Sequence, residues 1–360
     1  MSQTAEVFGL ARLGWGADFE QEFEQYESAG LVPGRVAVQH RGAYDVLVAD
    51  GEVRAGLPGK LLHDAGDKAD LPAVGDWVAV DAPVGGQSTI RAVLTRRTAF
   101  VRTAASDQHR ISEQQVVAAN VDTVFLVSAL ADDYNLRRLE RYLVLGWESG
   151  AQPVVVLTKA DLCDDVEAAV AEVESVAVGV RVHAVSNVTG QGVDELRPYF
   201  TGNRTVAALG SSGVGKSTLI NSLSGEEVMA TGAVRRDGRG RHTTTRRELI
   251  PVPGGGFFLD TPGMRELQLA EASGGIQEAF DDLVELFTHC RFTDCAHEAE
   301  PGCAVKAALD EGRLDEERWQ SYQKLQRELA MLERKLDARA KSEERKKWRR
   351  FSKAQRKDAW

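Results

Sequence analysis

One glycine-rich loop limits the fold of this chain more than any other segment. An apolar run at residues 206–209 stops at Gly210, and the sequence GSSGVGKST then leads into a helix-forming stretch. The pattern G-x-x-x-x-G-K-S lets backbone N–H groups surround a phosphate, because glycines tolerate the required turns and carry no Cβ. The helix that follows presents its unpaired N-terminal amides and its positive dipole end to the same anion. Strand, loop and helix in this order predict an α/β domain that binds a nucleotide.

Each residue of the loop has an expected task. Lys216 is expected to reach the β- and γ-phosphates and to act in catalysis, and the Ser217 hydroxyl is expected to ligate Mg²⁺. The full set expected to contact the nucleotide is Gly210, Ser211, Ser212, Gly213, Val214, Gly215, Lys216, Ser217 and Thr218. The loop by itself leaves open a plain turn between a strand and a helix.

Two further motifs indicate which nucleotide is bound. Residues 260–263, DTPG, match a D-x-x-G element, in which Asp260 holds Mg²⁺ through water and the Gly263 amide meets the γ-phosphate. The second motif, TKAD, comprises Thr158, Lys159, Ala160 and Asp161. A carboxylate at Asp161 can accept hydrogen bonds from guanine N1–H and the N2 amino group, and adenine offers neither donor on that edge.

Lys159 is expected along the face of the purine, and Ser186 with Asn187 is expected at the guanine O6. D-x-x-G alone would be an ordinary turn, and TKAD alone an ordinary strand end. Their occurrence together with the phosphate loop predicts GTP.

The other parts of the chain show different sequence patterns. Residues 34–112 contain short strand-forming segments separated by turn-forming residues, and about five strands in that length predict a small closed barrel of the OB type. Its basic residues, which are expected to bind RNA unless the barrel is purely structural, are Arg91, Arg96, Arg97, Arg102 and Arg110. Asp315 is predicted to cap a long helix with an apolar stripe from Trp319 to Leu336.

Charge is distributed unevenly along the chain. Residues 331–360 carry twelve Lys or Arg and five Asp or Glu, a net +7, whereas the whole chain carries −10. A basic tail on an acidic body indicates an anionic partner such as nucleic acid, or a solvated helix end. No run of 18 apolar residues and no signal-peptide core occur, so we expect a cytoplasmic protein without a membrane partner.

Three of the four cysteines lie close together near the C-terminus. Cys290, Cys295, His297 and Cys303 supply three thiolates and an imidazole, a full tetrahedral set for one structural Zn²⁺ per chain. Free buried cysteines remain the alternative, and His289 could replace His297. Cys163 stands apart and is expected to be a small core residue.

The order of the motifs is unusual, because the base-reading elements precede the phosphate loop. Joining old termini and cutting new ones allows such an order when the ends of a domain lie close together. The motifs GSSGVGKSTLINSL, GRGRHTTT, DTPGMREL and CRFTDCAHEAEPGC occur in this sequence in this order. With them the chain resembles the circularly permuted GTPases, specifically the ribosome small-subunit-dependent GTPase A family.

The resemblance implies a multidomain α/β protein. Its expected parts are an extension (1–33), an OB-fold RNA-binding domain (34–112), a circularly permuted GTPase domain with a mostly parallel sheet (113–280), a helical zinc-binding domain (281–345) and a basic tail (346–360). It also implies a monomer that binds the small ribosomal subunit and its rRNA, and that hydrolyses GTP late in subunit assembly.

The residues also suggest how hydrolysis proceeds. Met264 stands where many GTPases have the glutamine that orients water, so slow intrinsic turnover is expected. One of Thr243 and Thr244 is expected to ligate Mg²⁺, and His242 is expected either to position the water once a partner orders its loop or to contact RNA or solvent. An ATP-using kinase and a non-catalytic RNA-binding module with structural nucleotide are the two rival functions.

Overall fold

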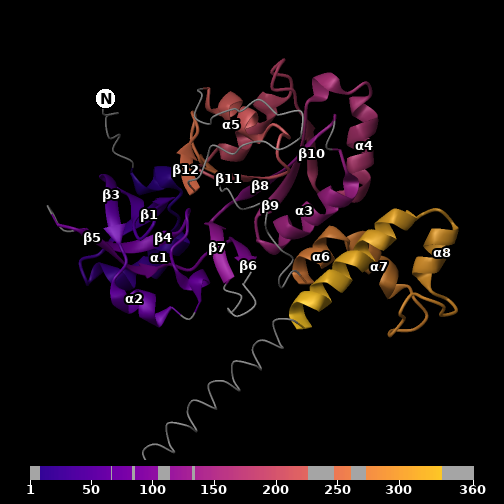
Figure 1. Ribbon diagram of the computed structural model, residues 1–360, viewed down its shortest axis with the longest axis horizontal. Helices are drawn as coiled ribbons and strands as arrows, with labels where there is room; N and C mark the ends of the chain where they lie inside the picture. The colour runs from indigo at the N-terminus through magenta and orange to yellow at the C-terminus, as the bar shows by residue number, and fades with distance from the viewer. Residues whose placement is uncertain are drawn as a thin grey trace, which may run out of the picture.

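Three structural parts follow one another along the chain (Figure 1). The computed structural model describes residues 9–65, 67–82, 86–103, 114–131, 134–225, 247–260 and 273–334. A barrel comes first, an α/β domain second and a group of helices last. This order agrees with the multidomain α/β architecture predicted from the sequence.

The barrel closes through five strands paired in the order β1, β2, β3, β5, β4 and back to β1. The β3–β5 pairing is parallel and the other four are antiparallel. Alternating residues such as Val36, Val46 and Ile90 fill its interior, which explains the period-two pattern of these strands. The predicted OB-type barrel is confirmed, and its elements are β1 (Val32–Gln39), β2 (Tyr44–Val48), β3 (Gly51–Gly56), α2 (Gly59–Asp64), β4 (Trp77–Asp81) and β5 (Ser88–Val93).

An N-terminal helix, α1 (Ala17–Glu27), packs on this barrel. Phe19 and Phe23 are buried one turn apart on the helix, and Trp15 meets Trp77 of β4 edge to face with ring centroids 4.7 Å apart. Glu22 accepts hydrogen bonds from the backbone N–H and the hydroxyl of Thr95. The segment before β1 therefore covers one side of the barrel.

The α/β domain contains a six-stranded sheet in the order β10, β9, β8, β11, β13, β12. Only β12 is antiparallel to its neighbour within this sheet. Every residue of β8 is buried, as expected for a central parallel strand. The strands are β8 (Thr123–Ala129), β9 (Gln152–Thr158), β10 (Arg181–Ala184), β11 (Thr205–Leu209), β12 (Arg247–Pro251) and β13 (Phe257–Asp260), and the helices are α3 (Leu136–Glu148), α4 (Val166–Val176) and α5 (Lys216–Ser224).

The barrel and the α/β domain share hydrogen bonds along an edge. Strand β1 pairs with β12, so the two sheets form one continuous ladder. Next to this junction lies a two-stranded ribbon of β6 (Ala99–Thr103) and β7 (Gln114–Ala119). The chain passes through the ribbon on its way from the barrel to β8.

The helical part packs against α3 and lies at one end of the α/β domain in Figure 1. It contains α6 (Ser273–Ala279), α7 (Asp281–Thr288), α8 (Ala304–Asp310) and a long helix over 316–334. Asp315 accepts hydrogen bonds from the N–H groups of Glu317 and Arg318, which confirms the predicted cap. Trp319, Leu325 and Leu329 are buried along the predicted stripe. Among the described residues, none of the helices has the length and apolarity needed to cross a membrane.

Candidate nucleotide and metal sites

The phosphate loop leaves β11 at Gly210 and ends at the first residue of α5. A Cβ on Gly210 would lie 2.4 Å from the carbonyl oxygen of Val127 in β8, so glycine is required for this close approach. Gly215, the residue before α5, has a φ of 94°, and no side chain caps the helix. The N-terminal amides of α5 are therefore open toward the loop, as a phosphate site requires.

Lys216 folds back over the loop that contains it. Its ammonium Nζ donates to the carbonyl oxygens of Gly210 at 2.7 Å and Ser211 at 2.6 Å. Val214 is buried and anchors the loop, whereas Ser211, Ser212 and Ser217 are half-buried and Thr218 is exposed. The positive charge thus lies at the mouth of the loop, where a nucleotide phosphate would compete for it.

The base-reading motif is tied directly to the phosphate loop. Thr158 is fully buried at the end of β9, and its hydroxyl donates to the carbonyl oxygen of Val214 at 2.5 Å. Lys159 has a φ of 59°, a left-handed conformation that turns the chain at the strand end. Ala160 then donates its N–H to the Val185 carbonyl oxygen at 3.1 Å, which joins this turn to the strand end that carries Ser186.

The two predicted base-reading segments meet at Ser186. Its hydroxyl donates to Asp161 Oδ1 at 2.5 Å and accepts from the N–H groups of Val188 and Thr189. Asn187 Oδ1 is buried and has no hydrogen-bond partner within the described part of the chain. Ser186 thereby orients the carboxylate of Asp161, and the residue after Ser186 carries an unsatisfied amide oxygen, as a site for a ligand with N–H donors would need.

All three segments converge at Gly215. A Cβ placed on this glycine would lie 3.5 Å from Asn187 Nδ2 and 3.7 Å from Thr158 Oγ1. The structure therefore brings the TKAD, Ser186–Asn187 and phosphate-loop segments to one edge of the sheet. This is the arrangement that their positions after three parallel strands of one sheet predict.

Only two of the residues expected to ligate Mg²⁺, Ser217 and Asp260, lie within the described part of the chain. Ser217 lies in the first turn of α5, and Asp260 is the last residue of β13, the parallel neighbour of β11. The D-x-x-G segment thus begins next to the phosphate loop. The predicted residues His242, Thr243, Thr244, Gly263 and Met264 lie outside the described residues.

Sequence reasoning missed one contact to the phosphate loop. Arg138 of α3 donates from Nη1 to Ser211 Oγ at 2.7 Å, and the Tyr142 hydroxyl lies 3.5 Å from the same oxygen. The two residues are one helical turn apart, on one face of α3. No local pattern pairs them with a residue about seventy positions away.

The four predicted metal ligands come together at one point. The ligand atoms of Cys290, Cys295, His297 and Cys303 all lie within 4.8 Å of one another. His297 Nδ1 is 3.6 Å from Cys290 Sγ and 3.5 Å from Cys303 Sγ. Tetrahedral zinc, with its usual Zn–S and Zn–N lengths, would place these atoms about 3.5 Å apart, so the donor set fits that ion. His289 is exposed and does not belong to this group.

Neighbouring groups hold the metal-binding loop in shape. The His297 ring stacks on Phe287 with centroids 4.4 Å apart and meets the edge of Trp319 from the long helix. Burial lowers the pKa of His297, which favours the neutral imidazole that a metal requires. Glu300 accepts hydrogen bonds from the N–H groups of Ala296, Glu298 and Ala299 and closes the loop. Cys163 lies apart from this cluster and is half-buried.

Three of the basic residues predicted for the barrel have acidic partners. Arg96 binds the fully buried Asp76 through Nε and Nη2, and it also donates to two backbone carbonyl oxygens. Arg97 pairs with Asp18 of α1, and Arg91 pairs with Asp81. Arg96 therefore acts in the packing of the barrel, and Arg110 lies outside the described residues.

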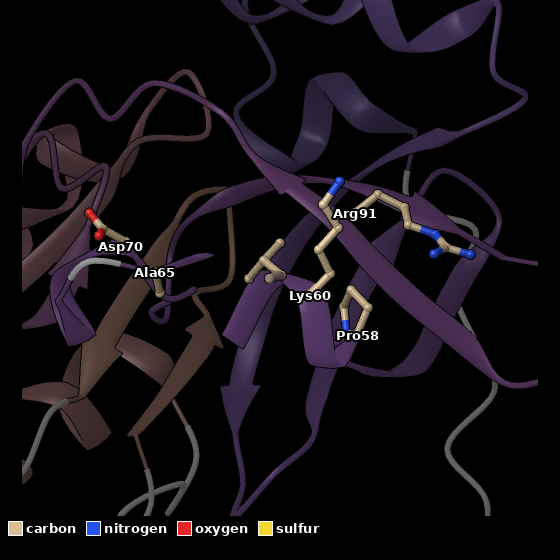
Figure 2. A pocket seen from close by; sticks show the side chains of 6 residues that line it. Pro58, Lys60, Ala65, Asp70 and Arg91 are labelled. Carbon is tan, nitrogen blue, oxygen red and sulfur yellow. The ribbon is translucent and has the colours of Figure 1, made fainter. Parts of the chain in front are cut away.

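A pocket of about 430 Å³ opens on the barrel (Figure 2). Lys60 and Arg91 lie at one side of it and Asp70 lies beyond Ala65 at the other. None of the residues that line it belongs to the phosphate loop or the base-reading segments. The pocket is separate from the nucleotide site.

The fold and the site together define a class of protein. A mostly parallel sheet carries the phosphate loop and the predicted base-reading motif at one edge, and its strand β13 ends at Asp260, the first residue of D-x-x-G. The predicted base-reading motif comes first in the sequence. This combination is that of a circularly permuted P-loop GTPase with a barrel before it and a helical Cys/His domain after it.

Comparison with known proteins identifies the family. The RsgA GTPase family matches residues 93–270. A "Small ribosomal subunit biogenesis GTPase RsgA" of Opitutus terrae is 47% identical over 96% of this chain and 97% of its own length. Another of the same name, from Streptomyces avermitilis, is 48% identical over 95% of this chain and 91% of its own length. The chain belongs to the RsgA GTPase family and is a GTP hydrolase.

Solved structures support the same fold. YjeQ from Thermotoga maritima has a TM-score of 0.63 and 27% identity, covering 83% of this chain and 99% of that protein. YloQ, described as a circularly permuted GTPase, has a TM-score of 0.60 and 24% identity, covering 83% of this chain and 95% of its own. The ABC transporter family also matches, over residues 194–358, a range that includes the phosphate loop. The Gly-rich loop is common to P-loop nucleotide-binding proteins, and the full-length relatives belong to the RsgA family.

Proposed function

We propose that this protein binds the small (30S) ribosomal subunit and its rRNA and hydrolyses GTP to GDP and phosphate late in the maturation of that subunit. The convergence of Thr158, Asp161, Ser186 and Asn187 on the phosphate loop supports GTP as the nucleotide. The ribosomal partner is taken from the names of relatives that match most of the chain. The protein would act as a cytoplasmic monomer.

The proposed domains are those that the sequence predicts. Residues 34–112 form the RNA-binding barrel, 113–280 the GTPase domain and 281–345 the zinc-binding domain, with an extension before them and a basic tail after them. The barrel, the metal-binding domain and the tail would provide separate contacts to rRNA.

In the reaction, water attacks the γ-phosphorus, and the bond between that phosphorus and the β–γ bridging oxygen breaks. Lys216 is the residue expected to contact the β- and γ-phosphates, after leaving the two carbonyl oxygens that it binds here. Asp161 and Asn187 select guanine, while Ser217, Asp260 and one of Thr243 and Thr244 would hold Mg²⁺, which neutralises developing phosphate charge. Gly263 would donate its amide to the γ-phosphate.

Water must be positioned by a group other than residue 264, because a thioether cannot orient water. We propose that His242 does so once the subunit orders the basic loop around it. The free protein would then hydrolyse GTP slowly and the bound protein faster.

Zinc is proposed as the resident metal of the Cys290, Cys295, His297 and Cys303 cluster, with one ion per chain. The group supplies four protein ligands, so it leaves no open position for catalysis and has a structural role. The metal would hold the turn between α7 and α8 beneath Trp319 of the long helix.

The decisive experiment compares GTP turnover with and without purified small subunits for the native protein and His242→Ala. Many-fold stimulation of the native protein, and loss of most of it in His242→Ala at unchanged GTP affinity and subunit binding, are expected. Lys216→Ala serves as the control that impairs nucleotide handling under both conditions. Turnover that is insensitive to subunits would contradict the proposed function, and full stimulation of His242→Ala would contradict only the role of the histidine.

A further inference from the structure

Helix α3 touches the phosphate loop on one face. The guanidinium of Arg138 reaches Ser211 Oγ at 2.7 Å, and Ser211 is the same residue whose carbonyl oxygen accepts from Lys216. Ser211 is therefore held from both sides, by Arg138 through its side chain and by Lys216 through its backbone. A shift of α3 would change how the first turn of the loop is held.

Another face of α3 forms ion pairs with the C-terminal helices. Arg141 binds both carboxylate oxygens of Glu328 in the long helix, at 2.7 and 2.8 Å. Arg137 pairs with Asp315 at the start of that helix at 2.8 Å. A bidentate pair fixes direction as well as distance, so the long helix and α3 are held in register.

The ion pairs between α3 and the long helix are continuous with a buried network of charged side chains. Glu140 has no exposed side-chain surface, and its Oε1 accepts from Arg137 at 2.6 Å and from Arg318 at 3.0 Å. Arg318 also binds Asp282 of α7. A buried carboxylate needs these cations, because an unpaired charge inside the protein is costly.

Helix α6 also approaches α3 closely. A Cβ on Gly275 would lie 2.3 Å from the carbonyl oxygen of Val144, and the Gly275 N–H donates to Glu148 Oε2 at 2.9 Å. Movement of α3 against the C-terminal helices would therefore break both the ion pairs and a tight backbone contact.

We propose that α3 mechanically couples the C-terminal helical domain to the phosphate loop, with Arg138 as the positioning residue at Ser211. The C-terminal helices fix α3 through Arg137, Glu140 and Arg141, and α3 fixes the loop through Arg138. By linkage, a nucleotide that reorganises the loop must shift the docking of the C-terminal helices by the same free energy. This inference depends on the nucleotide site and is independent of the ribosomal partner.

The first test measures the Kd of fluorescent GDP and the kinetics of intrinsic GTP turnover for Arg138→Ala, Arg138→Lys and Ser211→Ala. Loss of a hydrogen bond from a charged donor is expected to raise the Kd of GDP and the KM of GTP about tenfold or more. If the position of the loop affects the binding of the GTP ground state and of the transition state alike, kcat is expected to change less than about twofold. Arg138→Lys should recover part of the affinity, and Arg138→Ala combined with Ser211→Ala should be no worse than either alone.

The second test asks whether the ion pair on the other face of α3 affects nucleotide binding at the loop. Glu328→Ala and Arg141→Ala are expected to raise the Kd of GDP, and their effects are expected to be non-additive with Ser211→Ala. The charge-swapped pair Arg141→Glu with Glu328→Arg should recover affinity. Arg313→Ala is the matched control, because Arg313 pairs with Glu311 within its own loop.

Two results would overturn the proposal. A loss confined to kcat in Arg138→Ala would place the guanidinium at the transition state instead of the loop. Strictly additive effects of Glu328→Ala and Ser211→Ala, or an unchanged Kd of GDP in Glu328→Ala with the protein folded, would show that α3 transmits nothing.

Discussion

Replacing Arg35 tests how the barrel is held on the α/β domain. The side chain is 2% exposed, and its Nη1 donates to the Leu13 carbonyl oxygen at 2.5 Å. Its Nη2 donates to Thr205 Oγ1 at 2.6 Å, at the start of β11. The guanidinium also lies 5.7 Å from the ring of Trp77 and 5.5 Å from that of Phe257. One residue of β1 thus joins the N-terminal segment, the barrel and the GTPase sheet.

Two opposing effects determine the expected size of the change. Burial lowers the pKa of Arg35 from its ordinary value to about 10, a cost of roughly 3 kcal/mol for the charged form, although Asp122 opposes that shift. Two short hydrogen bonds from a charged donor contribute about 3–6 kcal/mol together, which offsets this cost. In Arg35→Met the burial cost disappears, but two buried acceptors remain unpaired at about 1–3 kcal/mol each. The lost hydrogen bonds and the relieved burial cost roughly cancel, so the two unpaired acceptors set the change, and the free energy of unfolding should fall by about 2–6 kcal/mol.

Urea unfolding followed by tryptophan fluorescence measures this difference, because Trp77 lies beside the guanidinium. With the slope m that is usual for a domain in urea, the urea concentration at the midpoint of the first unfolding transition should fall by roughly 1–2 M. Arg54→Met is the matched control, since that arginine belongs to the same barrel but is 66% exposed, and little change is expected. An Arg35→Met midpoint equal to or above that of the native protein would refute the reasoning, as it would mean that burial of the charge outweighs its hydrogen bonds.

Three further predictions concern the base site, the metal cluster and the helix contact. Asp161→Asn should weaken GTP binding and favour xanthine nucleotides in a competition assay, because a carboxamide pairs with a 2-oxo group; unchanged GTP affinity would contradict the role of TKAD. Cys303→Ser should lose bound zinc in metal analysis and lower the stability of the C-terminal helices, whereas Cys163→Ser should keep the metal. Gly275→Ala should destabilise the protein by about 1–3 kcal/mol in chemical denaturation, because its Cβ would meet the Val144 backbone oxygen at 2.3 Å; native stability would show that α6 can move away.

Much of the nucleotide and metal chemistry could be predicted from the sequence because each piece is local. The phosphate loop needs a fixed spacing of glycines and a lysine, and TKAD follows a continuous apolar run that indicates a buried strand. The convergence of these segments then follows from a general property of parallel sheets, whose carboxyl-terminal ends meet at one edge. The metal cluster likewise lies within fourteen residues, from Cys290 to Cys303.

The partners of the arginines could not be predicted in this way. Arg35 and Arg96 look alike in the sequence, yet Arg35 spans three parts of the fold and Arg96 neutralises the buried Asp76. An arginine side chain is long, so its partner depends on which segments the fold brings close to it and not on its neighbours in the sequence. Reading the barrel arginines as one basic surface therefore gave too little weight to ion pairs within the fold.

The permuted order of the chain has a consequence for how the attached domains can sense the nucleotide. Strand β12 follows the segment that contains His242 in the sequence and pairs with β1 of the barrel, so the barrel is attached directly after a segment that we propose to respond to the nucleotide. Strand β13 ends at Asp260, the first residue of D-x-x-G, and Cys290 comes only 27 positions after Gly263, so the domain with the Cys/His cluster closely follows D-x-x-G. In the ordinary order the base-reading strands would come between D-x-x-G and any C-terminal domain. Permutation removes those strands from that position. Helix α3, which lies between β8 and β9 in the sequence, provides a second connection between the C-terminal helices and the site, through Arg141 on one side and Arg138 on the other. The C-terminal helices therefore follow the D-x-x-G segment along the chain, and they are connected to the phosphate loop through α3, by the ion pairs of Arg137 and Arg141 and the hydrogen bond of Arg138.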